Sequence, residues 1–247
     1  MHYKLCIILV LALLPNALTA FAQPLQPKDS LIIAERIAMA EADWVPTGVW
    51  PFLNRKFRQG TVVTGFVREV KNEVFCNIHI GKHTVWYFKG ETLMEALPGT
   101  VKRVEVSGNV YVPMPDEKFG RIVRQDTIDG KMARVICVQT VDEAEMKRRG
   151  EDVSHLGSFT LSGDFGSIGL DLINSYDAHP EEKPLPIKNT FYFVYNGDVF
   201  ECTTKNILAH INPARKNEYR AFTRSAEIIS SQESSIQKIW KEFFLKR

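Results

Sequence analysis

The chain has 247 residues with 31 basic and 29 acidic side chains, so its net charge of +2 gives no strong field for attracting nucleic acid or an anionic membrane. Hydrophobic residues make up 45% and charged residues 24% of the chain, which is ordinary for a globular protein and excludes a disordered, fibrous or low-complexity one. This length suits one large domain or two small ones.

The first 22 residues, MHYKLCIILVLALLPNALTAFA, have the three parts of a secretory signal peptide. Lys4 precedes an apolar run over residues 5–14, a proline ends that run, and residues 20–22 read AFA, a cleavage pattern. The run is shorter than the roughly 18 apolar residues that a spanning helix needs. We therefore expect cleavage after Ala22, export to the periplasm, cell envelope or extracellular space, and no transmembrane segment after cleavage.

Residues 23–59 predict an N-terminal helix followed by an aromatic, turn-rich linker. The stretch DSLIIAERIAMAEADW, residues 29–44, begins with capping residues and carries apolar side chains at helical spacing. The linker that follows, WVPTGVWPFLN, is anchored by Trp44 and Trp50.

Residues 60–141 predict a β-rich domain. Short runs of β-branched and aromatic residues alternate with turn signals every 8–12 residues, and Asp129-Gly130 is a strong hairpin signal. This spacing indicates an antiparallel β sandwich or a partly open barrel.

The remaining residues divide into a loop-rich connector, residues 142–186, and a hairpin-plus-helices unit, residues 187–247. The connector starts with a short charged helix and becomes rich in glycine, serine and proline. The last unit has a hairpin turn at Asn196-Gly197 and a final helix with an apolar stripe at Ile236, Ile239, Trp240, Phe243 and Phe244. The predicted fold class is α+β, with the β domain flanked by the N-terminal helix and this C-terminal unit.

Three cysteines follow the signal peptide, namely Cys76, Cys137 and Cys202, and each lies in a strand-like apolar run. A disulfide scaffold needs a denser and even set of cysteines. We expect buried, unreactive thiols that behave as small hydrophobes. One disulfide is the most that three cysteines allow, and the sequence does not specify its pairing.

Residues 77–90, NIHIGKHTVWYFKG, place two histidines four positions apart beside aromatic residues. A two-residue type II′ turn at Gly81-Lys82 puts His79 opposite Thr84 and leaves His79 and His83 on opposite faces of the sheet, so they cannot share a metal. One face, the expected core side, carries Cys76, Ile78, Ile80, His83, Val85 and Tyr87. The other face carries Phe75, Asn77, His79, Thr84, Trp86 and Phe88.

Other patterns with chemical potential are weak. Asp177, His179 and Glu181 alternate in one loop and are candidate metal ligands, although an ordinary solvated linker explains the loop as well. Asp164 and Asp171 join them if the connector forms a pocket. Ser235 begins an S-x-x-K pattern, which we expect on the final helix away from its apolar stripe. The sequence predicts no catalytic residue and no cofactor.

The order of these parts resembles a group of uncharacterised secreted proteins of Bacteroides-like bacteria. The resemblance rests on the entry PFLNRKFRQGTV, residues 51–62, and on the closing hairpin FYFVYNGDVFECTTKNILAHI with its helices. It implies an exported protein and attaches no activity.

Two functional hypotheses follow from the sequence. The first is a non-enzymatic periplasmic or envelope-associated binding or assembly module, with an envelope protein as partner and Trp44, Trp50 or Trp86 as exposed anchors. The alternative is an exported hydrolase or a small-ligand or metal-binding protein with its site in the loops at residues 150–186.

Overall fold

The structure is a computed structural model that describes residues 45–47, 51–65, 68–90, 92–96, 98–151 and 183–246. The chain divides into two units, Met1–Trp44 and Val45–Arg247. The predicted signal peptide, the N-terminal helix, Trp44, Trp50 and most of the connector lie outside the described residues.

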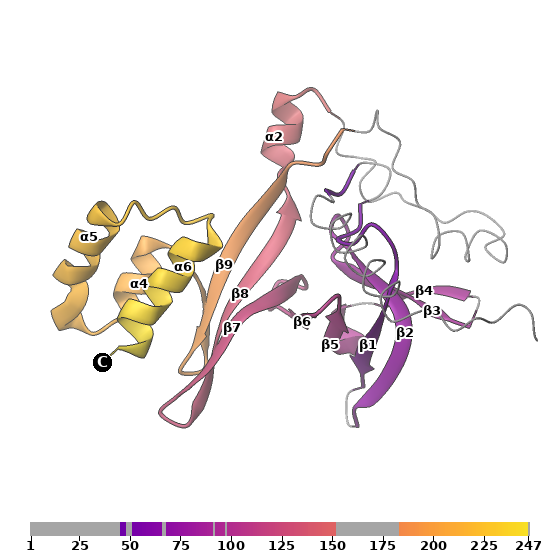
Figure 1. The fold of residues 1–247 in the computed structure, drawn as a ribbon, viewed down its shortest axis with the longest axis horizontal. Coiled ribbons are helices and arrows are strands. Elements are labelled where there is room, and N and C mark those ends of the chain that lie inside the picture. The colour runs from indigo at the N-terminus through magenta and orange to yellow at the C-terminus, as the bar shows by residue number, and fades with distance from the viewer. Residues whose placement is uncertain are drawn as a thin grey trace, which may run out of the picture. The chain divides into compact units, whose positions relative to one another are not determined.

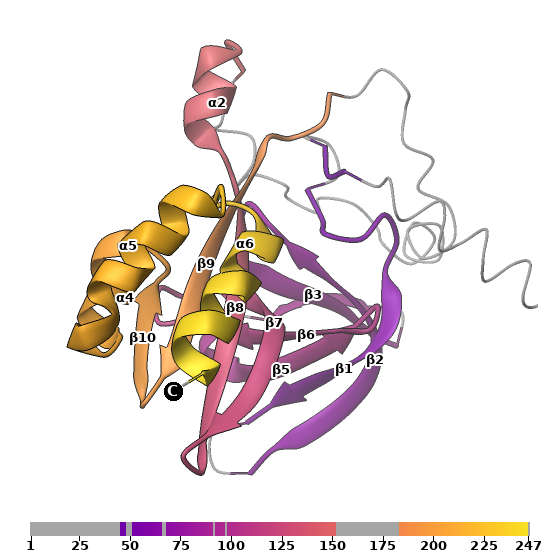
Figure 2. The same ribbon diagram turned by 60° about the vertical axis from the view of Figure 1, so that its left-hand side comes forward.

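One ten-stranded antiparallel sheet forms the frame of the second unit, in the order β10-β9-β8-β7-β6-β5-β1-β2-β3-β4. Its strands are β1 (Arg58–Thr64), β2 (Val70–His79), β3 (Thr84–Lys89), β4 (Thr92–Ala96), β5 (Val101–Val106), β6 (Asn109–Pro113), β7 (Phe119–Ile128), β8 (Lys131–Val141), β9 (Ile187–Tyr195) and β10 (Asp198–Glu201). The sheet curls into a half-barrel (Figures 1 and 2). The predicted antiparallel, β-rich α+β fold is confirmed at this level.

Tight turns join neighbouring strands where the sequence signals them. Asp129 and Gly130, and likewise Asn196 and Gly197, adopt positive φ angles. Two consecutive positive φ angles define the type I′ turn that matches the twist of a hairpin. Both predicted hairpins are therefore confirmed, and their turn residues explain them locally.

The β9–β10 hairpin continues the main sheet instead of forming a separate one. β9 pairs with β8 along its length, from Val141↔Ile187 to Arg134↔Val194. Strands that precede the connector and strands that follow it therefore belong to one continuous sheet.

Four α-helices accompany the sheet in the described residues: α2 (Glu143–Arg148), α4 (Thr204–His210), α5 (Lys216–Ser225) and α6 (Glu233–Trp240). Short helical turns η1 (Pro98–Thr100), η3 (Pro213–Arg215) and η4 (Lys241–Leu245) complete them. Helices α4 to α6 lie against the β8–β9 side, away from β1 to β5 (Figure 1).

Two large cores and two smaller clusters of buried residues lie within the described part of the unit. Beneath the helices, the predicted stripe of the last helix is buried against Phe191, Phe193 and Phe200. Within the curl, a second core consists of Val62, Cys76, Ile78, Val85, Ala96, Val101, Val104, Val106, Tyr111 and Phe119. We call the part of the sheet that carries the first core the helix-covered half, and the part that carries the second core the curled half.

Candidate functional site

The three cysteines are free and buried, as the sequence predicts. Burial raises the pKa of the Cys76 thiol to about 12 and that of the Cys137 thiol to about 11. Burial likewise raises the pKa of the Cys202 thiol. Because the thiolate is the nucleophile, these neutral thiols are packing groups.

The β2–β3 turn has the predicted register but a different conformation. His79 pairs with Thr84, as expected. The positive φ angle falls on His83, at 55°, and not on Gly81. The type II′ prediction is therefore wrong. The backbone N–H of Lys82 donates to Nδ1 of His79 at 3.1 Å, which closes the turn and leaves the left-handed conformation to His83.

The second face of this hairpin is also buried, which the sequence pattern does not predict. Residues 51–57 fold back along β2: the N–H of Ile80 donates to the carbonyl of Pro51, and the N–H of Leu53 to that of Ile78, both at 2.9 Å. This brings Phe52 into contact with rings of the hairpin. We call Phe52, Phe57, His79, Trp86 and Phe88 the aromatic cluster; each is buried and lies within ring contact of another member.

Trp86 is consequently 2% exposed and cannot serve as an exposed anchor. Its indole N–H donates to the hydroxyl of Thr84 at 3.0 Å. The prediction that Trp86 is an exposed anchor is therefore wrong. The segment that the sequence predicts to be a linker covers this side chain.

His79 is a buried, neutral brace within the cluster. Burial, followed by the nearby charge of Lys82, lowers the pKa of His79 to about 4. Nδ1 accepts the N–H of Lys82, so the proton of the neutral ring sits on Nε2. Nε2 has no hydrogen-bond partner among the described residues. The ring of Phe52 stands 5.1 Å away at 69°, a favourable edge-to-face arrangement.

Asn77 ties the covering segment to the hairpin from the same buried face. Its side-chain oxygen accepts the N–H of Asn54 at 3.0 Å, and its amide nitrogen donates to the carbonyl of Asn54 at 2.7 Å. A further bond at 3.3 Å reaches the carbonyl of Lys56. Asn77 thus satisfies backbone groups that burial would otherwise leave unpaired.

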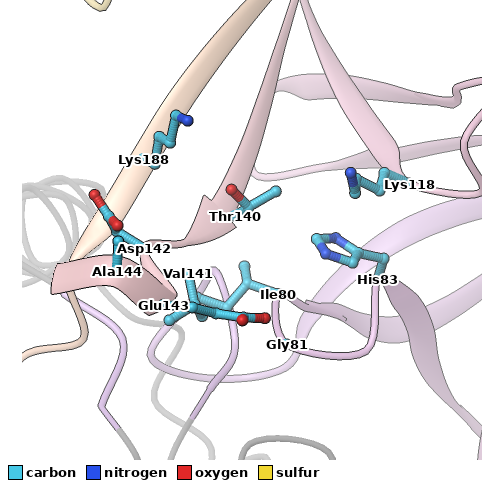
Figure 3. Close-up of a pocket in the computed structure, with 10 residues that line it drawn as sticks. All are labelled: Ile80, Gly81, His83, Lys118, Thr140, Val141, Asp142, Glu143, Ala144 and Lys188. Atoms are coloured by element: carbon cyan, nitrogen blue, oxygen red, sulfur yellow. The ribbon is translucent and has the colours of Figure 1, made fainter. Parts of the chain in front are cut away.

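A cleft of about 520 Å³ lies at the rim of the sheet, beside the β2–β3 turn. We call it the rim cleft. It is lined by Ile80, Gly81, His83, Lys118, Thr140, Val141, Asp142, Glu143, Ala144 and Lys188. These residues come from the β2–β3 turn, the residue before β7, the end of β8 with the first turn of α2, and β9 (Figure 3). The fold thereby gathers four segments that are distant in the sequence.

The rim cleft carries charges of both signs. Lys118 pairs with Asp116 at 2.7 Å, and this hydrogen bond raises the pKa of Lys118. Asp142 caps α2 by accepting the N–H of Glu145 at 3.1 Å. Burial, followed by the charge of Lys118, lowers the pKa of His83, so its imidazole is neutral at pH 7.

Thr140 and Lys188 face each other across the β8–β9 ladder and put a hydroxyl and an ammonium side by side in the cleft. Glu143 contributes a carboxylate from the first turn of α2. A cleft of this size with a few convergent polar groups can hold a small polar ligand.

The residues that the sequence proposes for a loop site are not tested. Asp164, Asp171, Asp177, His179 and Glu181 all lie outside the described residues. Within the described ranges, no group of three or more His, Cys, Asp or Glu side chains could hold a metal ion.

The prediction that Ser235 lies on the surface of the last helix is wrong. It is buried, and its hydroxyl accepts the backbone N–H of Ile229 at 3.2 Å. The hydroxyl of Ser235 therefore fixes the segment that leads into α6.

His83 is the cleft residue that sequence reasoning assigned to the core face. A side chain at a turn after glycine is a signal for a rim position, but its neighbours Lys118 and Lys188 lie far along the chain. The sequence alone does not show that they meet.

Comparison of the chain with protein-family models, with curated proteins and with solved structures gives no match. Of the helices in the described residues, none has the length and apolar character needed to cross a membrane.

Proposed function

We propose that this protein is a non-enzymatic, exported binding module that holds a small polar ligand in the rim cleft. The observation that carries the proposal is that Lys118, Thr140, Glu143 and Lys188 line one cleft beside a braced turn (Figure 3). Hydrogen-bond donors and acceptors placed on strands and tight turns are pre-organised, which lowers the cost of binding.

The chemistry of the described cleft favours holding a ligand over transforming it. His83 has lysine and aspartate as its charged neighbours. A nucleophilic mechanism instead needs a nucleophile such as a serine, threonine or cysteine within hydrogen-bond reach of a base, and among the described residues the hydroxyl of Thr140 makes no such bond. Binding is therefore the role that these side chains support best.

Export and an envelope partner are part of the proposal and rest on residues 1–22 and on the resemblance to secreted proteins. The test is fractionation of the source cells, followed by N-terminal sequencing of the protein. We expect Gln23 at the N-terminus in an exported fraction. An intact N-terminus in the cytoplasm would contradict export. Cross-linking in the envelope, read against a tag-only control, would identify a stoichiometric partner.

The cleft itself is tested by ¹H–¹⁵N NMR of the purified protein titrated with a panel of amino acids, carboxylates, amines, sugars and nucleoside monophosphates. We expect the largest shifts at His83, Thr140 and Lys188. The Lys188→Ala variant should weaken them. The matched control Lys131→Ala lies at the opposite end of β8, about 30 Å away at roughly 3.3 Å per residue, and should not. Shifts confined to other surfaces, or none with any probe, would overturn the proposed function.

A further inference from the structure

We propose that the edge strand β4 pairs with β4 of a second copy of this chain, so that two sheets join into one across a twofold axis at Met94. This inference goes beyond the rim cleft and does not depend on it. Its basis is the difference between the two edges of the sheet, β10 and β4. An edge strand presents unpaired backbone N–H and C=O groups, which another strand can pair unless side chains oppose the contact.

The β10 edge carries side chains that oppose pairing with a copy of itself. The strand has only four residues, Asp198–Glu201, with a carboxylate at each end. Antiparallel pairing of all four residues with those of a second copy would place Asp198 opposite Glu201 at both ends. Like charges directly opposite each other destabilise a strand pair. Short length and charged side chains are two of the ways in which proteins protect an edge.

The β4 edge lacks this protection. Its five residues, Thr92–Ala96, pair with β3 on one side, and no strand among the described residues pairs with the other side. Glu95 is the one charged residue of β4, and its own chain already holds the carboxylate. It accepts the hydroxyl of Thr84 at 2.9 Å and lies 3.7 Å from Nζ of Lys82. Its neighbour Met94 is a large hydrophobic residue that is 39% exposed.

The sequence of β4, TLMEA, is self-complementary in one antiparallel register. With Met94 on the twofold axis, Thr92 faces Ala96 of the copy and Leu93 faces Glu95, so no like charges meet. All five residues are then paired. Facing residues are separated by an even number of positions, so each face of one sheet continues into the same face of the other.

Met94 is the side chain that this pairing covers. Within its own chain it pairs with Tyr87 of β3, which in turn pairs with Cys76 in the core of the curled half. Two methionines that meet at the axis bury apolar surface that is exposed in a single chain, and the flexible thioether adapts to such a contact. A five-residue strand pair is smaller than a standard interface, so we expect a reversible dimer.

The first experiment is sedimentation velocity of the purified protein over a range of concentrations. We expect a monomer at low concentration and a dimer at high concentration. Met94→Lys places two like charges opposite each other at the axis, so it should remain a monomer where the unmodified protein is a dimer. The matched control is Val199→Lys on β10, which replaces a side chain that is 42% exposed and should not change the dimer.

Disulfide cross-linking tests the register. In Met94→Cys the two new thiols face each other, within the Cα separation that a disulfide allows, so oxidised glutathione should link two chains. In Thr92→Cys the two thiols are four positions apart along the ladder, roughly 13 Å at about 3.3 Å per residue, and should stay unlinked. The unmodified protein, which has four cysteines, gives the background.

A monomer at every concentration overturns the inference, and so does a dimer that Met94→Lys leaves intact. Linking through residue 92 as readily as through residue 94 would reveal a different register or surface and would also overturn it. None of these results changes the proposed function, because Thr92, Met94 and Val199 do not line the rim cleft. The NMR titration tests that cleft separately.

Discussion

The two halves of the sheet are stabilised by different physics. The helix-covered half buries one sheet face under an aromatic stripe, with Trp240 stacked on Phe244 at 5.3 Å and 15°. The curled half buries residues on both faces of the β2–β3 hairpin, including the polar side chains of Asn77 and His79. Loss of volume should therefore dominate mutational effects in the first half, whereas loss of hydrogen bonds and change of charge should dominate in the second.

This difference bears on function, because the β2–β3 turn of the curled half forms one wall of the rim cleft, which β8, α2 and β9 complete. The turn that carries His83 is closed by His79, and Lys82 within it lies 5.3 Å from the ring of Trp86 and 3.7 Å from Glu95. The protonation state of a buried side chain thus supports the geometry of the cleft.

Trp240→Ala should give the largest loss of stability. Trp240 is 0% exposed, and its indole N–H donates to Asp126 at 2.8 Å. We expect the free energy of unfolding to fall by about 3 to 5 kcal/mol, measured by urea denaturation. Trp240→Phe keeps most of the volume and should cost about 1 to 2 kcal/mol. Equal losses for both variants would show that the hydrogen bond, and not volume, dominates this half.

Acidification should act on the curled half through His79. Its pKa is about 4 in the folded protein and 6.5 for a histidine in the unfolded chain, so the unfolded chain binds more protons between these values. The stabilisation from the neutral ring is full above pH 6.5 and is lost as the pH falls towards 4, by ~3 kcal/mol in total.

The measurement is urea denaturation at several pH values, with the slope of His79→Phe subtracted from that of the unmodified protein. Ile239→Val, in the helix-covered half, is the control; it removes no titratable group and should keep the original slope. An unchanged slope in His79→Phe would show that other groups set the acid sensitivity.

Asn77→Ala should cost about 2 to 3 kcal/mol, because it leaves buried backbone groups of the covering segment unpaired. Asn109→Ala removes a single exposed bond to the carbonyl of Ser107 and should cost less than about 1 kcal/mol. Denaturation of the two variants side by side gives the comparison. A small effect of Asn77→Ala would mean that the covering segment is held by its rings alone.

The smallest effect is expected where α6 meets β7. Arg121 and Glu233 pair at 2.6 Å, but both side chains remain partly exposed. Glu233→Gln should therefore change the free energy of unfolding by less than ~1 kcal/mol, and added salt should reduce the difference. A larger loss would indicate that this pair couples the helices to the sheet.

Much of the fold is determined by local sequence and was predictable. The turn residues Asn196-Gly197 and Asp129-Gly130 set their hairpins, and the spacing of Ile236, Ile239 and Trp240 set the last helix. The burial of His79 and Trp86 was not predictable from alternation, because a segment more than twenty positions earlier in the chain covers them. The rim cleft was not predictable for a similar reason, since it exists only where four distant segments meet.

The most direct test of the central claim is a crystal structure of the protein grown with the ligand that gives the largest NMR shifts. We predict that this ligand lies in the rim cleft, in contact with Lys188 and Thr140. An empty cleft with the His83 turn intact, or the ligand bound at another surface, would contradict the claim.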